Sequence, residues 1–221
     1  SEKPTLVKLR PGPQQFPWHQ DHENYWLWQD TLNYLNFYIP IVKPTLEKSN
    51  LTLAPFDRFQ ERAPEVHREL VGRGATRVLP SGKRWIVKDD DRGGIVARLD
   101  FDLAEIEETP LLAPGDLLLM RGDLIHRTQD SSTRRIAASI RYINGDTLIR
   151  RASLARGSLA KAVMMVNGRD MYGPAFESFA AAACDTQSAA VMDRYIKQQI
   201  QAGTPSMGRA AFLSRLLREK S

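Results

Sequence analysis

The stretch Asn33-Tyr34-Leu35-Asn36-Phe37-Tyr38-Ile39 decides the class of fold. Aromatic and branched side chains dominate it, which is typical of a β-strand. Further short strands are predicted from Leu6 to Tyr142, including a hairpin of 77–80 against 83–87 around Ser81-Gly82. The N-terminal two thirds of the chain is therefore predicted to be mainly β.

After Ser153 the pattern changes to helix-like runs separated by Gly and Pro, at 158–166, 175–184, 188–202 and 206–220. We expect residues 1–150 to form a double-stranded β-helix (jelly-roll) core and residues 151–221 to form a helical extension. That extension would pack on the core or on another copy of the chain. The stretch 56–110 is long for a connection, and we expect this insert, with a helix at 63–72, to cover a site.

His19-Gln20-Asp21 is the first motif that carries chemistry. On an extended segment residues i and i+2 point to the same side, so His19 and Asp21 can reach one ion while Gln20 faces away. His126 follows a predicted strand at 116–120 and a turn at 121–123. Two histidines and one carboxylate on a sheet predict the ligand triad of non-haem Fe(II) oxygenases.

Another predicted strand, Thr133–Tyr142, follows this site, and Arg135 within it lies nine residues beyond His126. Alternation places Arg135, Ala137, Ser139 and Arg141 on one face. An arginine beside a metal suits a dicarboxylate cosubstrate, because its planar fork grips a carboxylate by two parallel hydrogen bonds. We assign this role to Arg135, since Ser139 follows on the same face.

From Trp18 to Tyr142 the chain resembles the phytanoyl-CoA dioxygenase family of Fe(II)/2-oxoglutarate oxygenases. The matching motifs are Trp18-His19-Gln20-Asp21, Leu51-Thr52-Leu53-Ala54-Pro55, Gly115-Asp116 through His126, and Arg135 with Ser139. The resemblance implies that His19, Asp21 and His126 ligate iron and that Arg135 holds the distal carboxylate of 2-oxoglutarate. It also implies further cosubstrate contacts by Asn36 and Tyr38.

The chain departs from that family at two kinds of place. Two turn motifs of the family differ in this chain, which has Lys48-Ser49-Asn50 and Pro55-Phe56-Asp57-Arg58 at those places. Neither difference involves a predicted metal ligand. Only eighteen residues precede His19, where relatives carry a long helical segment. Substrate contacts made by that segment are expected to be missing, replaced or supplied by another chain.

Composition agrees with a cytoplasmic enzyme. The single Cys184 forbids an internal disulfide, and no apolar run is long enough for a membrane span. The net charge is +5, but charges of both signs are mixed along the chain, so nucleic acid is not indicated, while an anionic substrate is preferred.

Of the other histidines, His22 should point away from the metal and His67 should lie on the surface of a helix. The acidic run 89–91 lacks the alternating ligand pattern of a calcium loop.

We therefore expect an Fe(II)/2-oxoglutarate-dependent dioxygenase that uses dioxygen to hydroxylate, or otherwise oxidise, a small organic substrate. Two alternatives stay open from the residues. A Zn(II) hydrolase could use the same three ligands, and a jelly-roll binding protein without turnover could retain them. A homo-oligomer is also left open by the amphipathic C-terminal runs.

Overall fold

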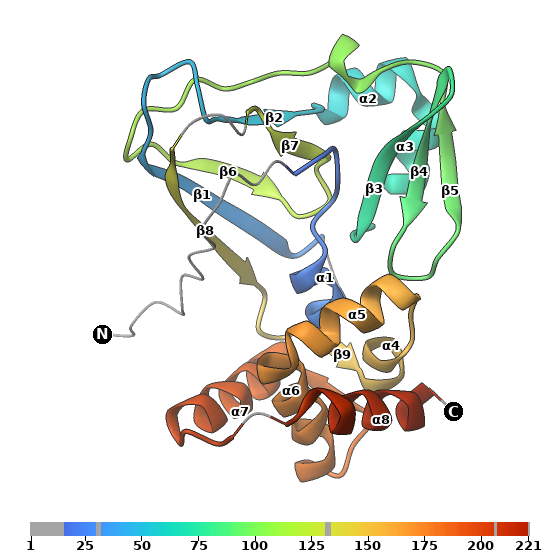
Figure 1. The fold of residues 1–221 in the computed structure, drawn as a ribbon, viewed down its shortest axis with the longest axis vertical. Helices are drawn as coiled ribbons and strands as arrows, with labels where there is room; N and C mark the ends of the chain where they lie inside the picture. The colour runs from blue at the N-terminus through green and yellow to red at the C-terminus, as the bar shows by residue number, and fades with distance from the viewer. Residues whose placement is uncertain (1–15, 30–31, 131–133, 206, 221) are drawn as a thin grey trace.

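The computed structural model describes residues 16–29, 32–130, 134–205 and 207–220. The protein is mixed α/β: small antiparallel sheets make up the N-terminal part, and helices gather in the C-terminal part (Figure 1). The strands are β1 (Tyr34–Val42), β2 (Leu51–Leu53), β3 (Thr76–Ser81), β4 (Arg84–Asp89), β5 (Ile95–Leu99), β6 (Leu118–Arg121), β7 (His126–Thr128), β8 (Ile136–Ile143), β9 (Leu148–Arg150) and β10 (Thr186–Ser188). The helices are α1 (Glu23–Trp28), α2 (Phe56–Arg62), α3 (Pro64–Leu70), the 3₁₀ helix η1 (Leu103–Glu105), α4 (Arg151–Ala155), α5 (Leu159–Asn167), α6 (Arg169–Ala181), α7 (Ala189–Gln201) and α8 (Arg209–Lys220).

One sheet has the strand order β6-β1-β8, and β1 pairs antiparallel with both neighbours. The predicted strand at 33–39 is confirmed as the centre of this sheet. Tyr34, Asn36 and Tyr38 are buried on its inner face, while Leu35 and Phe37 between them are half-buried on the other face. Strand periodicity therefore points every second residue of β1 toward the interior of the protein.

A second layer is organised by Trp18–Gln20, which runs between β7 and β3. His19 and His126 exchange two backbone hydrogen bonds of 3.0 Å. On the opposite edge, Gln20 donates its backbone N–H to Thr76 O (3.1 Å) and Val78 donates to Trp18 O (2.9 Å). The layer continues through β2 on the far side of β7 and through β4 and β5 beyond β3.

The two layers pack on each other through a small apolar core. Its buried members come from β1, β2, β6 and the connecting loops: Tyr38, Leu51, Leu53, Leu112, Met120 and Leu124. Burial of each large apolar side chain contributes roughly 1.5–3 kcal/mol relative to exposure. Within the described residues the strands form small sheets and close no barrel, so the jelly-roll remains a prediction.

The insert 56–110 differs in detail from its prediction. The helix expected at 63–72 is α3, and α2 precedes it directly. The hairpin forms, but Ser81 pairs with Arg84, so its two-residue turn is Gly82-Lys83 rather than Ser81-Gly82. Gly82 has φ of 63°, a left-handed conformation that glycine adopts without strain.

The strand predicted at 116–120 is shifted and only partly buried. It is β6, Leu118–Arg121, and Leu119 and the preceding Leu117 are each about half exposed. These two residues lie on a sheet face that is not covered within the described part of the chain. The apolar run 117–120 predicts a buried strand, and this prediction was wrong for that reason.

The acidic run 89–91 holds three separately paired carboxylates. Asp89 pairs with Arg73, Asp90 with Arg77 and His22, and Asp91 with Lys161. Each carboxylate points to a different partner. The run is a set of structural contacts rather than a shared cation site.

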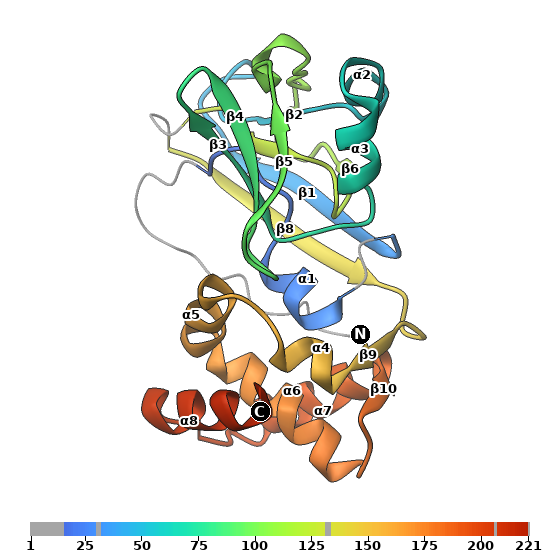
Figure 2. The same cartoon turned by 90° about the vertical axis from the view of Figure 1, so that its right-hand side faces the viewer.

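The C-terminal helices share a core with the start of the chain. Trp26 and Leu27 of α1 are buried among residues of α4 to α8, and α1 lies between strands and helices in both views (Figures 1 and 2). The predicted runs are found as α5, α6, α7 and α8 with shifted ends. The β9-β10 pair was not predicted. Among the helices that the structure describes, none has the length and apolar character to cross a membrane.

Candidate metal centre

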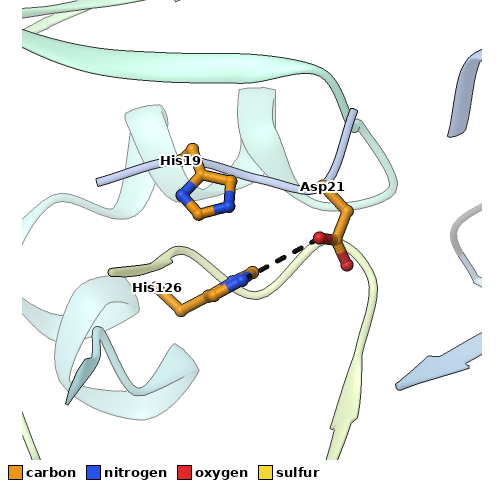
Figure 3. A group of neighbouring side chains, drawn as sticks. All are labelled: His19, Asp21 and His126. Atoms are coloured by element: carbon orange, nitrogen blue, oxygen red, sulfur yellow. Dashed lines mark ion pairs between the residues drawn. The ribbon is translucent and has the colours of Figure 1, made fainter. Parts of the chain in front are cut away.

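His19, Asp21 and His126 meet at the inner edge of the second layer. One ligand atom from each of the three residues lies within 4.8 Å of the other two. Figure 3 shows both imidazoles and the carboxylate turned toward one another. The structure thus brings together the three residues that the sequence singled out as metal ligands.

The convergence follows from local backbone geometry. His19 and Asp21 are two residues apart on an extended segment and so share a side. Gln20 points the other way, where its buried amide donates to Leu70 O and to Asp123 O, each at 2.8 Å. The antiparallel pairing of His19 with His126 places their ring centroids 4.4 Å apart.

Backbone carbonyls orient both imidazoles. His19 Nδ1 lies 2.7 Å from Pro17 O, and His126 Nδ1 lies 2.9 Å from Leu124 O. A carbonyl oxygen can only accept, so each Nδ1 carries a proton, and Nε2 is the ring nitrogen left to bind a metal. Most metal-binding histidines donate such a hydrogen bond from the ring nitrogen that does not bind the metal.

Asp21 is held by polar side chains of β1 and β8. Asn36 Nδ2 donates to Asp21 Oδ2, and Tyr34 Oη donates to the same oxygen at 3.4 Å. The other oxygen, Oδ1, lies 3.9 Å from His126 Nε2 and 3.3 Å from Arg141 Nη2. Oδ1 is therefore the oxygen that faces His126 and Arg141.

The electrostatics place His19 and Asp21 in the protonation states that bind a cation. Burial, reinforced by His126, lowers the pKa of His19 to about 3. Burial would raise the pKa of Asp21, but Arg141 and the two imidazoles outweigh it and bring the pKa to about 2. At neutral pH His19 is a neutral donor and Asp21 is a charged one.

Asn36, Tyr38 and Ser139, named for cosubstrate contacts, lie along one stretch of the β1–β8 pair. Asn36 contacts Asp21 directly, while Tyr38 is the cross-strand partner of Ser139. Burial raises the pKa of Tyr38. The charge of Arg135, which comes just before β8, offsets only part of that rise. Within the described residues, the buried atoms Arg135 Nη1 and Tyr38 Oη have no hydrogen-bond partner.

The sequence alone did not reveal the contacts of Tyr34 and Arg141 with Asp21. Tyr34 lies two residues before Asn36, so strand alternation was a usable signal for it. Arg141 is the cross-strand partner of Asn36. That pairing depends on the register of β8 against β1, which no local pattern encodes.

The two remaining histidines lie outside the triad. His22 Nε2 lies 3.0 Å from Asp90 Oδ2, although the His22 ring also lies beside that of His19, with centroids 6.0 Å apart. His67 was predicted to be a surface residue, but it is half-buried against the edges of the Phe56 and Phe59 rings. This prediction was wrong because α2 packs beside α3 and covers that side of the helix.

Comparison with known proteins found no family model, curated protein or solved structure that matches this chain.

Proposed function

We propose that this protein is an Fe(II)- and 2-oxoglutarate-dependent oxygenase that hydroxylates, or otherwise oxidises, a small organic substrate. One observation carries the proposal. Two histidines whose Nδ1 atoms are held by backbone carbonyls lie with Asp21 so that one ligand atom from each residue is within 4.8 Å of the other two. Such a facial set leaves the opposite side of an ion open to ligands, as non-haem Fe(II) oxygenation requires.

The strand pairings support a double-stranded β-helix as the scaffold. Two antiparallel layers enclose the core around Tyr38, and the ligands lie where the His19 segment meets β7. The His19–Asp21 segment lies beside β7, which begins at His126, in one layer. The strands β1 and β8 of the other layer supply the polar residues around Asp21.

The residues that would receive 2-oxoglutarate fit a dicarboxylate. Arg135 Nη1 and Tyr38 Oη are buried donors without partners in the described chain, and burial of unsatisfied donors costs about 1–3 kcal/mol each. A carboxylate accepts hydrogen bonds from both groups. The distal carboxylate of 2-oxoglutarate would therefore satisfy them, with Asn36 and Ser139 closer to the metal end of the inner face.

The division of labour in the site follows from these contacts. When bound, iron and 2-oxoglutarate supply the oxidative chemistry, in which 2-oxoglutarate and dioxygen yield succinate, carbon dioxide and an oxidised substrate. His19 and His126 supply neutral nitrogen donors, and Asp21 supplies one negative charge. Asn36 and Tyr34 hold the carboxylate so that Oδ1 keeps its orientation toward His126.

Iron-dependent conversion of 2-oxoglutarate to succinate tests the proposal. We expect purified protein to form succinate with Fe(II) and dioxygen, and His19→Ala, Asp21→Ala and His126→Ala each to abolish it with the fold retained. His22→Ala is the matched control, because the Nε2 atom of His22 pairs with Asp90.

Succinate should be measured by mass spectrometry, beside metal content and a circular dichroism spectrum. Near-normal turnover in any ligand variant would exclude the assignment. Metal-dependent hydrolysis without succinate would point to the zinc alternative, and binding of ligands without any turnover would point to the inactive binding protein.

A further inference from the structure

Arg141 occupies an unusual position beside the triad. Its Nη2 lies 3.3 Å from Asp21 Oδ1, the oxygen that also faces His126. The side chain of Asp21 is 4% exposed, whereas that of Arg141 is 36% exposed. The guanidinium therefore reaches from a buried metal ligand to the solvent-accessible edge of the site.

A cation at the triad changes the surroundings of Arg141. In the metal-free chain Asp21 is the strongest favourable partner of Arg141, and the negative charge of Glu23 on α1 is a weaker one. Tyr34 also faces Arg141, but burial and the nearby Asp21 raise the pKa of its hydroxyl well above the usual value, so it stays neutral. A divalent ion bound by Asp21 would repel the guanidinium and neutralise its counter-ion.

We propose that Arg141 binds the carboxylate of a metal-chelating ligand on the open side of the triad. This proposal rests on the metal centre of the proposed function and adds a ligand contact to it. Arg141 pairs with Asp21 and, when a metal binds, turns to the carboxylate that enters with it. The ligand class is a 2-oxo acid or a similar chelating carboxylate, because an anion that binds the ion beside Asp21 Oδ1 comes within reach of Arg141.

This role differs from that of Arg135. In β8, Arg141 lies opposite Asn36, which contacts Asp21, whereas Arg135 precedes the strand and interacts with Tyr38. Six residues of extended chain separate the two arginines, roughly 20 Å along the backbone. The two arginines therefore differ in position along the β1–β8 pair and in the side chains that they contact.

Oxalate separates these two arginines experimentally, because it chelates a metal but lacks a distal chain. Mn(II) is the metal probe, titrated into the metal-free protein, and oxalate or 2-oxoglutarate is then titrated into the Mn(II)-loaded protein by calorimetry. The variants are Arg141→Gln and Arg141→Lys, with Arg135→Gln as the matched control. Circular dichroism verifies that each variant is folded.

We expect Arg141→Gln to weaken oxalate binding at least about tenfold and Arg141→Lys to weaken it less, since lysine keeps the charge but loses the planar fork. Arg135→Gln should leave oxalate binding unchanged while weakening 2-oxoglutarate. The Mn(II) affinity of Arg141→Gln should equal or exceed that of the wild type, because the guanidinium no longer competes for Asp21. A purely structural role of Arg141 would lower Mn(II) affinity instead.

Equal oxalate affinity in Arg141→Gln and wild type would overturn the proposal. Loss of Mn(II) binding in Arg141→Gln would also overturn it, in favour of a structural role. If oxalate binding depends on Arg141 but 2-oxoglutarate does not bind at all, the role of Arg141 stands and the assigned cosubstrate falls. Failure of the wild type to bind Mn(II) would overturn both this inference and the proposed metal centre.

Discussion

Asn36 and Asp21 form a hydrogen bond between two almost fully buried side chains, with Asn36 Nδ2 donating to Asp21 Oδ2. Asn36 belongs to β1 and Asp21 to the segment that continues the other layer. The bond thus connects the two layers at the metal site. It leaves Asp21 Oδ1 directed toward His126.

Replacement of Asn36 should reduce metal affinity without removing a ligand. We expect Asn36→Ala to weaken Mn(II) binding about 10–100-fold, the usual effect of losing a group that orients a ligand. Loss of a buried partner should also cost roughly 1–3 kcal/mol of unfolding free energy. Mn(II) titration and denaturant unfolding measure the two effects.

Asn167→Ala is the control for this variant, because Asn167 is exposed at the end of α5. It should change neither quantity appreciably. Unchanged Mn(II) affinity in Asn36→Ala would show that Tyr34 and Arg141 hold Asp21 without help from Asn36.

Replacement of Arg135 should affect the cosubstrate rather than the metal. Arg135→Ala is expected to weaken 2-oxoglutarate binding by roughly 2 to 5 kcal/mol, the range for breaking a buried charge pair. Mn(II) affinity without cosubstrate should change little. Arg134 is exposed and serves as the neighbouring control, so Arg134→Ala should bind 2-oxoglutarate like the wild type. If calorimetry shows weaker 2-oxoglutarate binding for Arg134→Ala and wild-type binding for Arg135→Ala, the assignment is wrong by one residue.

The ion-paired Asp90 should make stability depend on acid pH. Its burial would raise its pKa, but hydrogen bonds from His22 and Arg77 prevail and lower the pKa to about 2, below the usual value of an aspartate. A depressed carboxyl pKa stabilises the fold above the unfolded-state pKa, and the contribution is lost as pH falls through the folded-state pKa. We expect Asp90→Asn to cost about 2 kcal/mol at pH 7.

The difference between Asp90→Asn and wild type should shrink between about pH 4 and pH 2, where the wild-type carboxyl becomes protonated. Denaturant unfolding at a series of pH values measures it. A difference that stays constant down to pH 2 would show that the charge of Asp90 contributes nothing beyond its shape.

Gly122 lies against the ring of Tyr34, and this contact links the turn before His126 to the metal site. A Cβ at Gly122 would overlap the Tyr34 ring, so Gly122→Ala must displace the ring or the turn. We expect a loss of typically 1–3 kcal/mol in unfolding free energy, the usual cost of overpacking. Mn(II) affinity should fall as well, because Tyr34 contacts Asp21.

Gly173 in α6 is the matched control, because a Cβ there meets no atom within 4 Å. Alanine has the higher helix propensity, but Pro174 follows and disfavours the helical conformation of a residue with a Cβ, so Gly173→Ala should change stability by no more than about 1 kcal/mol in either direction. Thermal and denaturant unfolding of both variants measure these changes in stability. An equally stable Gly122→Ala protein would mean that the turn yields without strain.

Several features were predictable because they depend on neighbours along the chain. Aromatic and branched residues identified β1, and helix-like runs between Gly and Pro identified α5 to α8 apart from their ends. The His-x-Asp spacing indicated that His19 and Asp21 share a side, since an extended backbone imposes that geometry wherever the segment lies. The three proposed metal ligands were therefore visible in the sequence.

Other features were decided by tertiary structure. Arg141 contacts Asp21 because β8 pairs with β1 in one register, and a shift by one residue would send the side chain to the other face. His67 is half-buried because α2 lies beside it, and Trp26 enters the C-terminal core because α1 packs between strands and helices. The sequence by itself determined which side chains can act as ligands and on which side of a strand they lie. Only the packing of segments about a hundred residues apart decided the distances between them and the charges around them, because those depend on contacts that no local pattern records.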